Sequence, residues 1–333
     1  MTVSMKNFTA SPTAKNKIYF ALAGVLVFLL AVISLFTGKY PFSLPAILSG
    51  DKQELRTFLM LRVSRTVTAL FGGFVLGAAG FVYQTVFRNP LASPDIIGVS
   101  SGASAGAAAG ILLLGGSVFV TGFSFIGAVS AVLLALLIAS IDKSGRKSTI
   151  VLAGIAVHAL AQAVLMALKL LADPEKELAR IEFWIMGSLS GVRMTDIGWN
   201  LILCAACMLA LFLLHRQTLL LSADEGEAQM LGVPVQKLRL WILLIATLSV
   251  ASVVSLTGLI SFVGLLAPHV ARLLTRDNRP RTMFLSGLLG SAILTGADIL
   301  ARSISSVELP VSIFTSLLGA PLLVILAIRK GGE

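Results

Sequence analysis

The stretch GVSSGASAGAAAG, residues 98–110, repeats glycine at four-residue intervals, at Gly98, Gly102, Gly106 and Gly110. Residues four apart share one face of a helix, so these glycines form a smooth strip that neighbouring alanines and serines widen. Glycine disfavours a helix in water, but in a lipid bilayer the backbone must bond to itself and the helix forms regardless. We therefore predict a close-packing strip on a membrane helix, which meets another helix, a substrate, or both.

The composition of the whole chain agrees with a membrane location. Of its 333 residues, 56% are hydrophobic and 13% are charged, and the mean hydropathy is +0.94. Soluble domains carry about twice that share of charge. A net charge of +10 can indicate nucleic-acid binding, but here the basic residues lie in loops between apolar segments. The sequence predicts an all-α polytopic membrane protein that contacts lipid and no nucleic acid.

Long apolar runs predict the membrane helices, because about 20 apolar residues are needed to cross a bilayer. The runs lie at 18–36, 66–83, 96–116, 119–141, 149–172, 197–214, 240–274, 283–300 and 311–328. The run at 240–274 is too long for one crossing, and dividing it near Leu256-Thr257-Gly258 gives about ten helices. We expect a tail at 1–17, one transmembrane domain at 18–330, and a polar loop at about 216–238.

The positions of the basic residues predict the orientation. An even number of crossings puts both termini on one side, and short basic loops stay in the cytoplasm. The loops at 142–147 and 272–281 are short and densely basic, and they fall on the same side as the termini. We expect a multi-pass protein of the cell (plasma or inner) membrane with both termini cytoplasmic.

Two cytoplasmic segments interrupt the apolar pattern. The stretch FRNPLASPDIIG, residues 87–98, contains two prolines and is typical of a shaped turn, which serves as a constriction, a partner contact or a plain connection. The loop at 216–238 offers acidic and small residues that a cytoplasmic protein could grip, or it is a solvated connector.

Charged residues also gather on the opposite side of the predicted bundle. Arg62 and Arg65 lie at the start of the second run, and Asp298, Arg302 and Glu308 lie between the last two. Asp298 and Arg302 are four apart on a helix, which predicts a local ion pair. Alternatively the arginines meet an acidic soluble partner, since guanidinium groups suit carboxylates. The sequence leaves both open.

Motifs for catalysis are missing from the sequence. The nearest imitation of a phosphate-binding loop, GRKST at 145–149, lacks the upstream glycine and the Gly-Lys step. No H-E-x-x-H and no paired carboxylates occur within the apolar runs. We expect no enzyme activity, no catalytic residue and no bound metal or cofactor in this chain.

Taken in order, eight stretches resemble the FecCD family of ABC-importer permeases, which includes ferric-siderophore, haem and cobalamin permeases. They run from about residue 61 to 322 and read LRVSRTVTALFGG, QTVFRNPLASPDIIGVSSGASAG, IVLAGIAV, FWIMGSLSG, EAQMLGVP, GLISFVGLLAPHVARLL, GADILAR and ELPVSIFTSLLGAP. The resemblance implies the ten-helix fold of type II importers and alternating-access transport, with iron(III)-siderophore as the expected substrate and haem or cobalamin as alternatives.

The resemblance also implies partners: a second permease subunit, identical or homologous, two cytoplasmic ATPase subunits that bind the ATP and Mg²⁺, and an extracytoplasmic substrate-binding protein. It implies a role for three sets of residues in this sequence. Binding-protein docking falls on Arg62, Arg65 and Arg302, the cytoplasmic gate on Asn89, Leu91 and Ser148, and ATPase docking on Glu225, Ala228, Leu231 and Gly232.

A different class, the ion-coupled secondary transporter, needs ionisable groups within the membrane to bind the driving ion. His158 is the main candidate for such a group in this chain. Dependence of transport on ATP separates the two classes.

Overall fold

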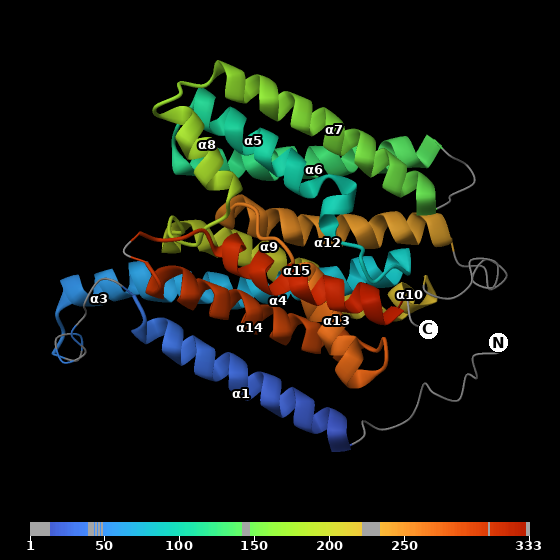
Figure 1. Cartoon of the computed structure of the whole chain (residues 1–333), viewed down its shortest axis with the longest axis horizontal. Coiled ribbons are helices and arrows are strands. Elements are labelled where there is room, and N and C mark those ends of the chain that lie inside the picture. Colours follow the sequence, from blue (N-terminus) through green and yellow to red (C-terminus); the bar gives the residue numbers. More distant parts are fainter. Residues whose placement is uncertain are drawn as a thin grey trace.

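The computed structural model describes residues 14–38, 43, 45, 47, 49–141, 147–221, 234–305 and 307–330. Within these residues, ten helices run along the length of the molecule (Figure 1): α1 Ala14–Phe36, α4 Ser64–Phe87, α5 Val99–Leu113, α6 Ser117–Ile141, α7 Lys147–Leu171, α9 Met194–Leu213, α12 Val235–Thr257, α13 Val263–Thr275, α14 Pro280–Ser303 and α15 Val311–Lys330. Seven of the described helices are long and apolar enough to cross a membrane, and α5, α13 and Val311–Pro321 are shorter apolar helices. The all-α membrane fold predicted from the sequence is confirmed.

The long apolar run divides where the sequence predicts. Helix α12 ends at Thr257 and α13 begins at Val263. Between them Gly258 has a φ of +70°, which glycine adopts without strain, and a side chain there would overlap the Trp184 carbonyl oxygen. The predicted limits at 18 and at 96–116 are less accurate. Helix α1 begins at Ala14, and α5 is shorter because Pro94–Ile97 form a separate 3₁₀ turn, η3.

Short helices mark the two ends of the bundle. Helix α3 (Lys52–Phe58) continues through the π-helical turn η2 (Leu59–Val63) into α4 and projects beyond its neighbours at the end where α8 (Glu177–Ile185) also lies (Figure 1). We call this the α3 end. Helix α10 (His215–Leu220) lies at the opposite end, the α10 end, where α1 begins and α15 ends.

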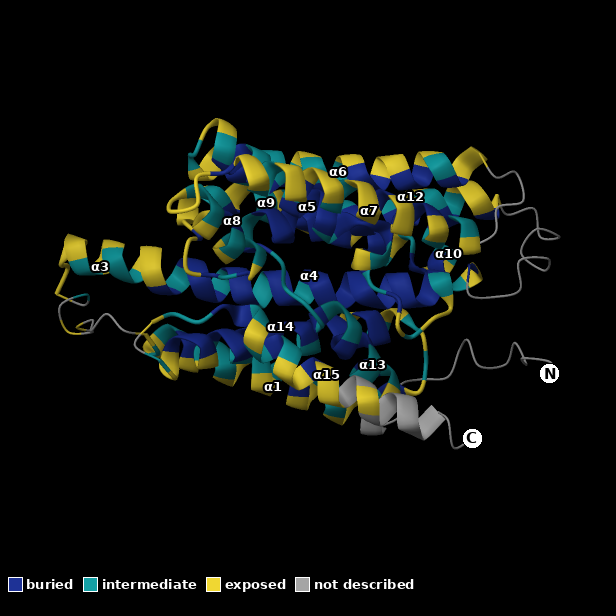
Figure 2. Cartoon of the chain, turned by 45° about the horizontal axis from the view of Figure 1, so that its top comes forward, coloured by how far each residue is buried: buried dark blue, intermediate teal, exposed yellow. Residues whose placement is uncertain are grey.

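Helix α4 is the central helix and is buried along most of its length (Figure 2). Glycines on α4 allow the backbones of neighbouring helices to approach it closely. A methyl group at Gly73 would lie 2.8 Å from Cα of Ser291 on α14, and one at Gly80 would overlap the Gly264 carbonyl oxygen on α13. Close backbone approach of this kind is how membrane helices associate where the hydrophobic effect is weak. The two ends of α4 therefore hold fixed positions in the bundle.

Helix α7, unlike α4, is exposed over much of its surface. It lies at one side of the bundle (Figure 1) and exposes large apolar side chains, with Leu152 66% and Leu170 86% exposed. His158 is also exposed on this helix. An apolar surface of this extent requires lipid or another protein against it.

Candidate functional site

Five charged residues meet at the α3 end, from segments far apart in the sequence. The Arg65 guanidinium donates from Nε to Asp298 Oδ1 at 2.6 Å and from Nη1 to Glu308 Oε2 at 2.9 Å. Arg302 Nη2 lies 3.0 Å from Asp298 Oδ2. Arg62, Arg65, Arg302 and Glu308 line a cavity of about 170 Å³, and Asp298 lies behind Arg65 and Arg302. We call it the arginine pocket.

The pocket carries an excess of positive charge in a buried setting. Arg62, Arg65 and Arg302 are each about 95% buried and Asp298 is fully buried, whereas the Glu308 side chain is 34% exposed. The pocket thus contains three guanidinium groups and two carboxylates, which pair with Arg65 and Arg302. Within the described part of the chain, Arg65 Nη2 and Arg302 Nε have no hydrogen-bond acceptor. Buried donors without acceptors are costly, so this arrangement favours a further anion.

Local structure explains why these arginines turn inward. The π-helical turn η2 places Arg62 on the buried side of the helix before α4 begins. π-Helical turns are rare and are common at functional sites. Arg302 is tied to α1 by hydrogen bonds from Nη1 to the Thr37 carbonyl oxygen at 2.9 Å and from Nη2 to Ser34 Oγ at 2.6 Å. Helices α1, α4 and α14 therefore position the pocket jointly.

The three residues predicted for binding-protein docking thus lie together, and the predicted local pair of Asp298 with Arg302 is present. Sequence reasoning missed the Arg65–Asp298 pair, which joins positions 233 apart. It also missed the burial of the arginines, since polar residues at the start of an apolar run read as surface groups. Their docking role stays a prediction.

The predicted gate residues lie at the α10 end. Asn89 and Leu91 are exposed in the turn after α4, where Asn89 Oδ1 accepts from the Leu91 amide at 2.9 Å. Ser148 is exposed at the start of α7. The turn leads into η3, which packs on α7 so closely that a side chain at Gly154 would overlap the Ile96 carbonyl oxygen. The segment after the Asn89–Leu91 turn is therefore packed on α7, the helix that carries Ser148.

The glycine strip faces α6. A methyl group at Gly102 would lie 2.5 Å from Cβ of Ala131, and one at Gly110 would lie 2.9 Å from Cα of Val120. At Gly106 it would overlap the Phe123 carbonyl oxygen. Gly98 differs from the other three, because it joins η3 to α5 with a φ of +86°. The strip is thus a helix-packing surface over Gly102, Gly106 and Gly110.

The predicted ATPase-docking residues Glu225, Ala228, Leu231 and Gly232 lie outside the described residues, between α10 and α12. The described residues contain no group of three or more His, Cys, Asp or Glu side chains that could hold a metal ion.

A half-buried arginine, Arg272, lies near the other end of α4. Arg272 of α13 donates to Gln84, to Thr85 Oγ1 at 2.9 Å and to the Phe81 carbonyl oxygen at 3.2 Å. Its Nε donates to Asn278 Oδ1 at 2.8 Å, and its guanidinium carbon lies 4.4 Å from the centre of the Phe81 ring. All of these partners are uncharged.

His215 of α10 stacks on the Phe81 ring, with ring centres 6.3 Å apart. Phe81 thus contacts both His215 and Arg272. Burial lowers the pKa of His215 to about 4, although the nearby Asn278 backbone and Asp277 act in the other direction. His215 is therefore neutral at physiological pH.

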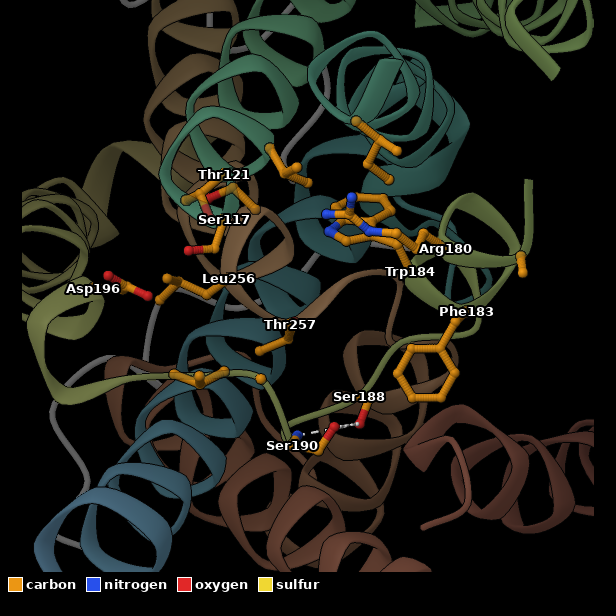
Figure 3. Close-up of a pocket in the computed structure, with 16 residues that line it drawn as sticks. Ser117, Thr121, Arg180, Phe183, Trp184, Ser188, Ser190, Asp196, Leu256 and Thr257 are labelled. Carbon is orange, nitrogen blue, oxygen red and sulfur yellow. Dashed lines mark hydrogen bonds between the residues drawn. The ribbon is translucent and has the colours of Figure 1, made fainter. Parts of the chain in front are cut away.

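A cavity of about 430 Å³ lies beside α8 at the α3 end (Figure 3). It brings together the aromatic side chains Phe183 and Trp184, the Arg180 guanidinium and the hydroxyls of Ser188 and Ser190. Arg180 Nη2 donates to the Gly115 carbonyl oxygen at 2.7 Å. No pattern in the sequence predicts this cavity, because its lining comes from five helices and a loop.

Comparison with known proteins identifies the fold and the family. Residues 26–329 match the model of the FecCD transport family. The chain belongs to the FecCD transport family. It is therefore a multi-pass transport permease of the ABC-importer type rather than an enzyme.

Individual FecCD relatives match over nearly the whole chain. The molybdate import permease MolB of Haemophilus influenzae is 33% identical, over 96% of this chain and 98% of its own. The Fe(3+)-citrate import permease YfmE of Bacillus subtilis is 35% identical, over 90% and 91%. A solved structure described as an inward-facing metal-chelate type ABC transporter has 32% identity and a TM-score of 0.86, covering 94% of this chain and 99% of that one.

Proposed function

We propose that this chain carries an iron(III)-siderophore-type metal chelate across the cell membrane by alternating access. The observation that carries the proposal is the FecCD membership over residues 26–329, together with an arginine pocket at one end of the bundle and an exposed turn at the other. Partner ATPases supply the free energy, so this chain holds neither ATP nor Mg²⁺. Its contacts with the partners differ between the inward and outward states.

In this proposal the α10 end faces the cytoplasm and the α3 end faces outward. The turn between α13 and α14 supports this orientation, because it and its flanks carry Arg272, Arg276, Arg279 and Arg281 at the α10 end. Short basic loops of this kind stay cytoplasmic. Both termini are then cytoplasmic as well.

An extracytoplasmic substrate-binding protein docks at the α3 end through acidic side chains. The arginine pocket supports this role, since Arg65 and Arg302 keep buried donors without acceptors among the described residues. Arg62 completes the cationic lining. A carboxylate that enters the pocket forms charge-assisted hydrogen bonds, which are about twice as strong as neutral ones.

The remaining partners meet other surfaces. Two cytoplasmic ATPase subunits bind the segment with Glu225, Ala228, Leu231 and Gly232, and movement there reaches the gate at Asn89, Leu91 and Ser148. A second permease subunit completes the pathway. The exposed apolar face of α7 contacts either lipid or another subunit.

An iron chelate is proposed as substrate because YfmE and other FecCD relatives are named for iron chelates. MolB shows that the family also serves an oxyanion, which sequence reasoning did not consider. Haem and cobalamin remain the alternatives within the proposal.

Transport into proteoliposomes tests the proposal. Vesicles containing the permease and its ATPase are given the binding protein and a ⁵⁵Fe-labelled siderophore. Uptake should require ATP and the binding protein. Uptake driven by a proton or sodium gradient without ATP would instead establish the secondary transporter, in which His158 on α7 is the candidate ion-binding group.

A further inference from the structure

The two carboxylates of the arginine pocket are held very differently. Asp298 is fully buried on α14 and lies within 3.0 Å of both Arg65 and Arg302. Glu308 comes from the connection between α14 and α15, and its carboxylate lies 2.9 Å from Arg65 Nη1. Its side chain is 34% exposed. Asp298 is therefore a fixed part of the pocket, and Glu308 approaches from the rim.

Glu308 is the more easily released of the two carboxylates. Its side chain is partly exposed, so water solvates the carboxylate when it is released, and an entering carboxylate compensates the Arg65 guanidinium that it leaves. The backbone beside it is anchored separately, since the Leu309 amide donates to the Ala301 carbonyl oxygen at 3.2 Å. Rotation of the Glu308 side chain thus frees Arg65 Nη1 without moving α14.

The charges show what the vacated position accepts. With Glu308 in place, three guanidinium groups face two carboxylates, and with Glu308 withdrawn they face Asp298 alone. Arg65 then presents Nη1 together with Nη2, which already has no acceptor among the described residues. Two adjacent guanidinium N–H groups match a carboxylate in bidentate geometry.

We propose that Glu308 is a built-in occupant of the arginine pocket, and that an acidic side chain of the substrate-binding protein docks by displacing it. This inference rests on the docking role given under Proposed function. The exchange conserves charge, since one carboxylate leaves as another enters. Glu308 thereby keeps the buried guanidinium groups paired when the binding protein is absent and sets how tightly the binding protein is held.

The test compares two variants that each remove one negative charge from the α3 end. E308Q removes the negative charge of the occupant. E182Q is the matched control, because Glu182 on α8 is 46% exposed and pairs with Lys169 at 2.8 Å, away from the pocket. Affinity for the soluble substrate-binding protein of this importer is measured by surface binding to the detergent-purified transporter complex. We expect E308Q to bind about fivefold tighter than the wild type and E182Q to bind within about twofold of it.

A second readout needs no binding protein. Sodium acetate supplies a carboxylate that fits the vacated position, so its titration should raise the melting temperature of E308Q more than that of the wild type or E182Q. Sodium chloride at equal ionic strength is the control for screening.

Affinity of E308Q equal to or weaker than that of the wild type would overturn the inference, as would equal acetate responses in all three proteins. The R62Q variant distinguishes failure of the Glu308 exchange from failure of the docking role of the pocket. Weaker binding by R62Q with no gain in E308Q would reject the exchange and leave the docking role intact. Unchanged binding in both variants would reject the docking role as well.

Discussion

An arginine lies at each end of α4, and the partners of its guanidinium group differ between the two ends. At the α3 end Arg65 is paired with the carboxylates of Asp298 and Glu308, and neighbouring guanidinium donors remain without acceptors among the described residues. At the α10 end Arg272 donates to an amide, a hydroxyl and a carbonyl, and stacks on Phe81.

The difference distinguishes a binding site from a structural tie. Arg272 is held by neutral partners on α4 and in the turn after α13, and these hydrogen bonds join α13 to α4. Its donors are thus satisfied without an anion. The Glu308 carboxylate at Arg65 can be exchanged for another, because charge-assisted pairs form equally well with a partner's acid. An arginine with one exchangeable acidic partner is thus suited to docking.

The largest expected effect follows from removing the fixed carboxylate. D298N leaves three buried guanidinium groups with Glu308 alone, and loss of one partner from a buried ion pair costs about 3–5 kcal/mol. We expect a large fall in the melting temperature of the detergent-purified protein. D196N, at a half-buried aspartate of α9, should change it little. Equal melting of D298N and the wild type would show that the cluster does not stabilise the α3 end.

A smaller loss is expected at the α10 end. R272M keeps the apolar contact with Phe81 but removes hydrogen bonds that join α13 to α4, at a cost of about 1–3 kcal/mol. R272K keeps the charge without the planar fork and should recover only part of the stability. Full recovery by lysine, measured by thermal unfolding, would show that charge rather than geometry holds Arg272.

Acid should weaken the α10 end through His215. Its pKa falls from about 6.5 in the unfolded chain to about 4 in the fold, so the unfolded state binds the proton more readily between those values. Stability is therefore complete above pH 6.5 and declines as the pH falls toward 4, by at most about 2 kcal/mol at pH 5. H215Q should flatten this dependence in melting curves, whereas H158Q, at the exposed His158, should retain it.

The smallest effect concerns an exposed ion pair outside both clusters. K169M breaks the contact of Lys169 with Glu182 on α8, and exposed pairs contribute between 0 and about 1 kcal/mol. The melting temperature should stay within about two degrees of the wild type. A shift as large as that of D298N would remove the distinction between buried and exposed pairs on which the comparison depends.

Local signals in the sequence predicted the helices but not the contacts between them. Apolar length gave ten crossings, and Gly258 marked the break between α12 and α13. The spacing of Asp298 and Arg302 predicted their pair because four residues make one helical turn.

Contacts that depend on the tertiary fold could not be predicted from the sequence. The partners of Arg272 lie about 190 positions away on α4, and no periodic pattern relates them. The π-helical turn that buries Arg62 has no sequence signature either. Sequence reasoning therefore found the docking arginines through resemblance to the family, while the exchangeable Glu308 emerged only from the geometry.

Site-specific photo-crosslinking tests the central claim, that the α3 end meets the binding protein and the α10 end meets the ATPases. A photoreactive residue replaces Leu61, exposed at the rim of the arginine pocket, or Leu91, exposed in the gate turn. In the assembled transporter, position 61 should crosslink to the binding protein, and position 91 should crosslink to the ATPase and never to the binding protein. Crosslinking of the binding protein at position 91, or of the ATPase at position 61, would contradict the account.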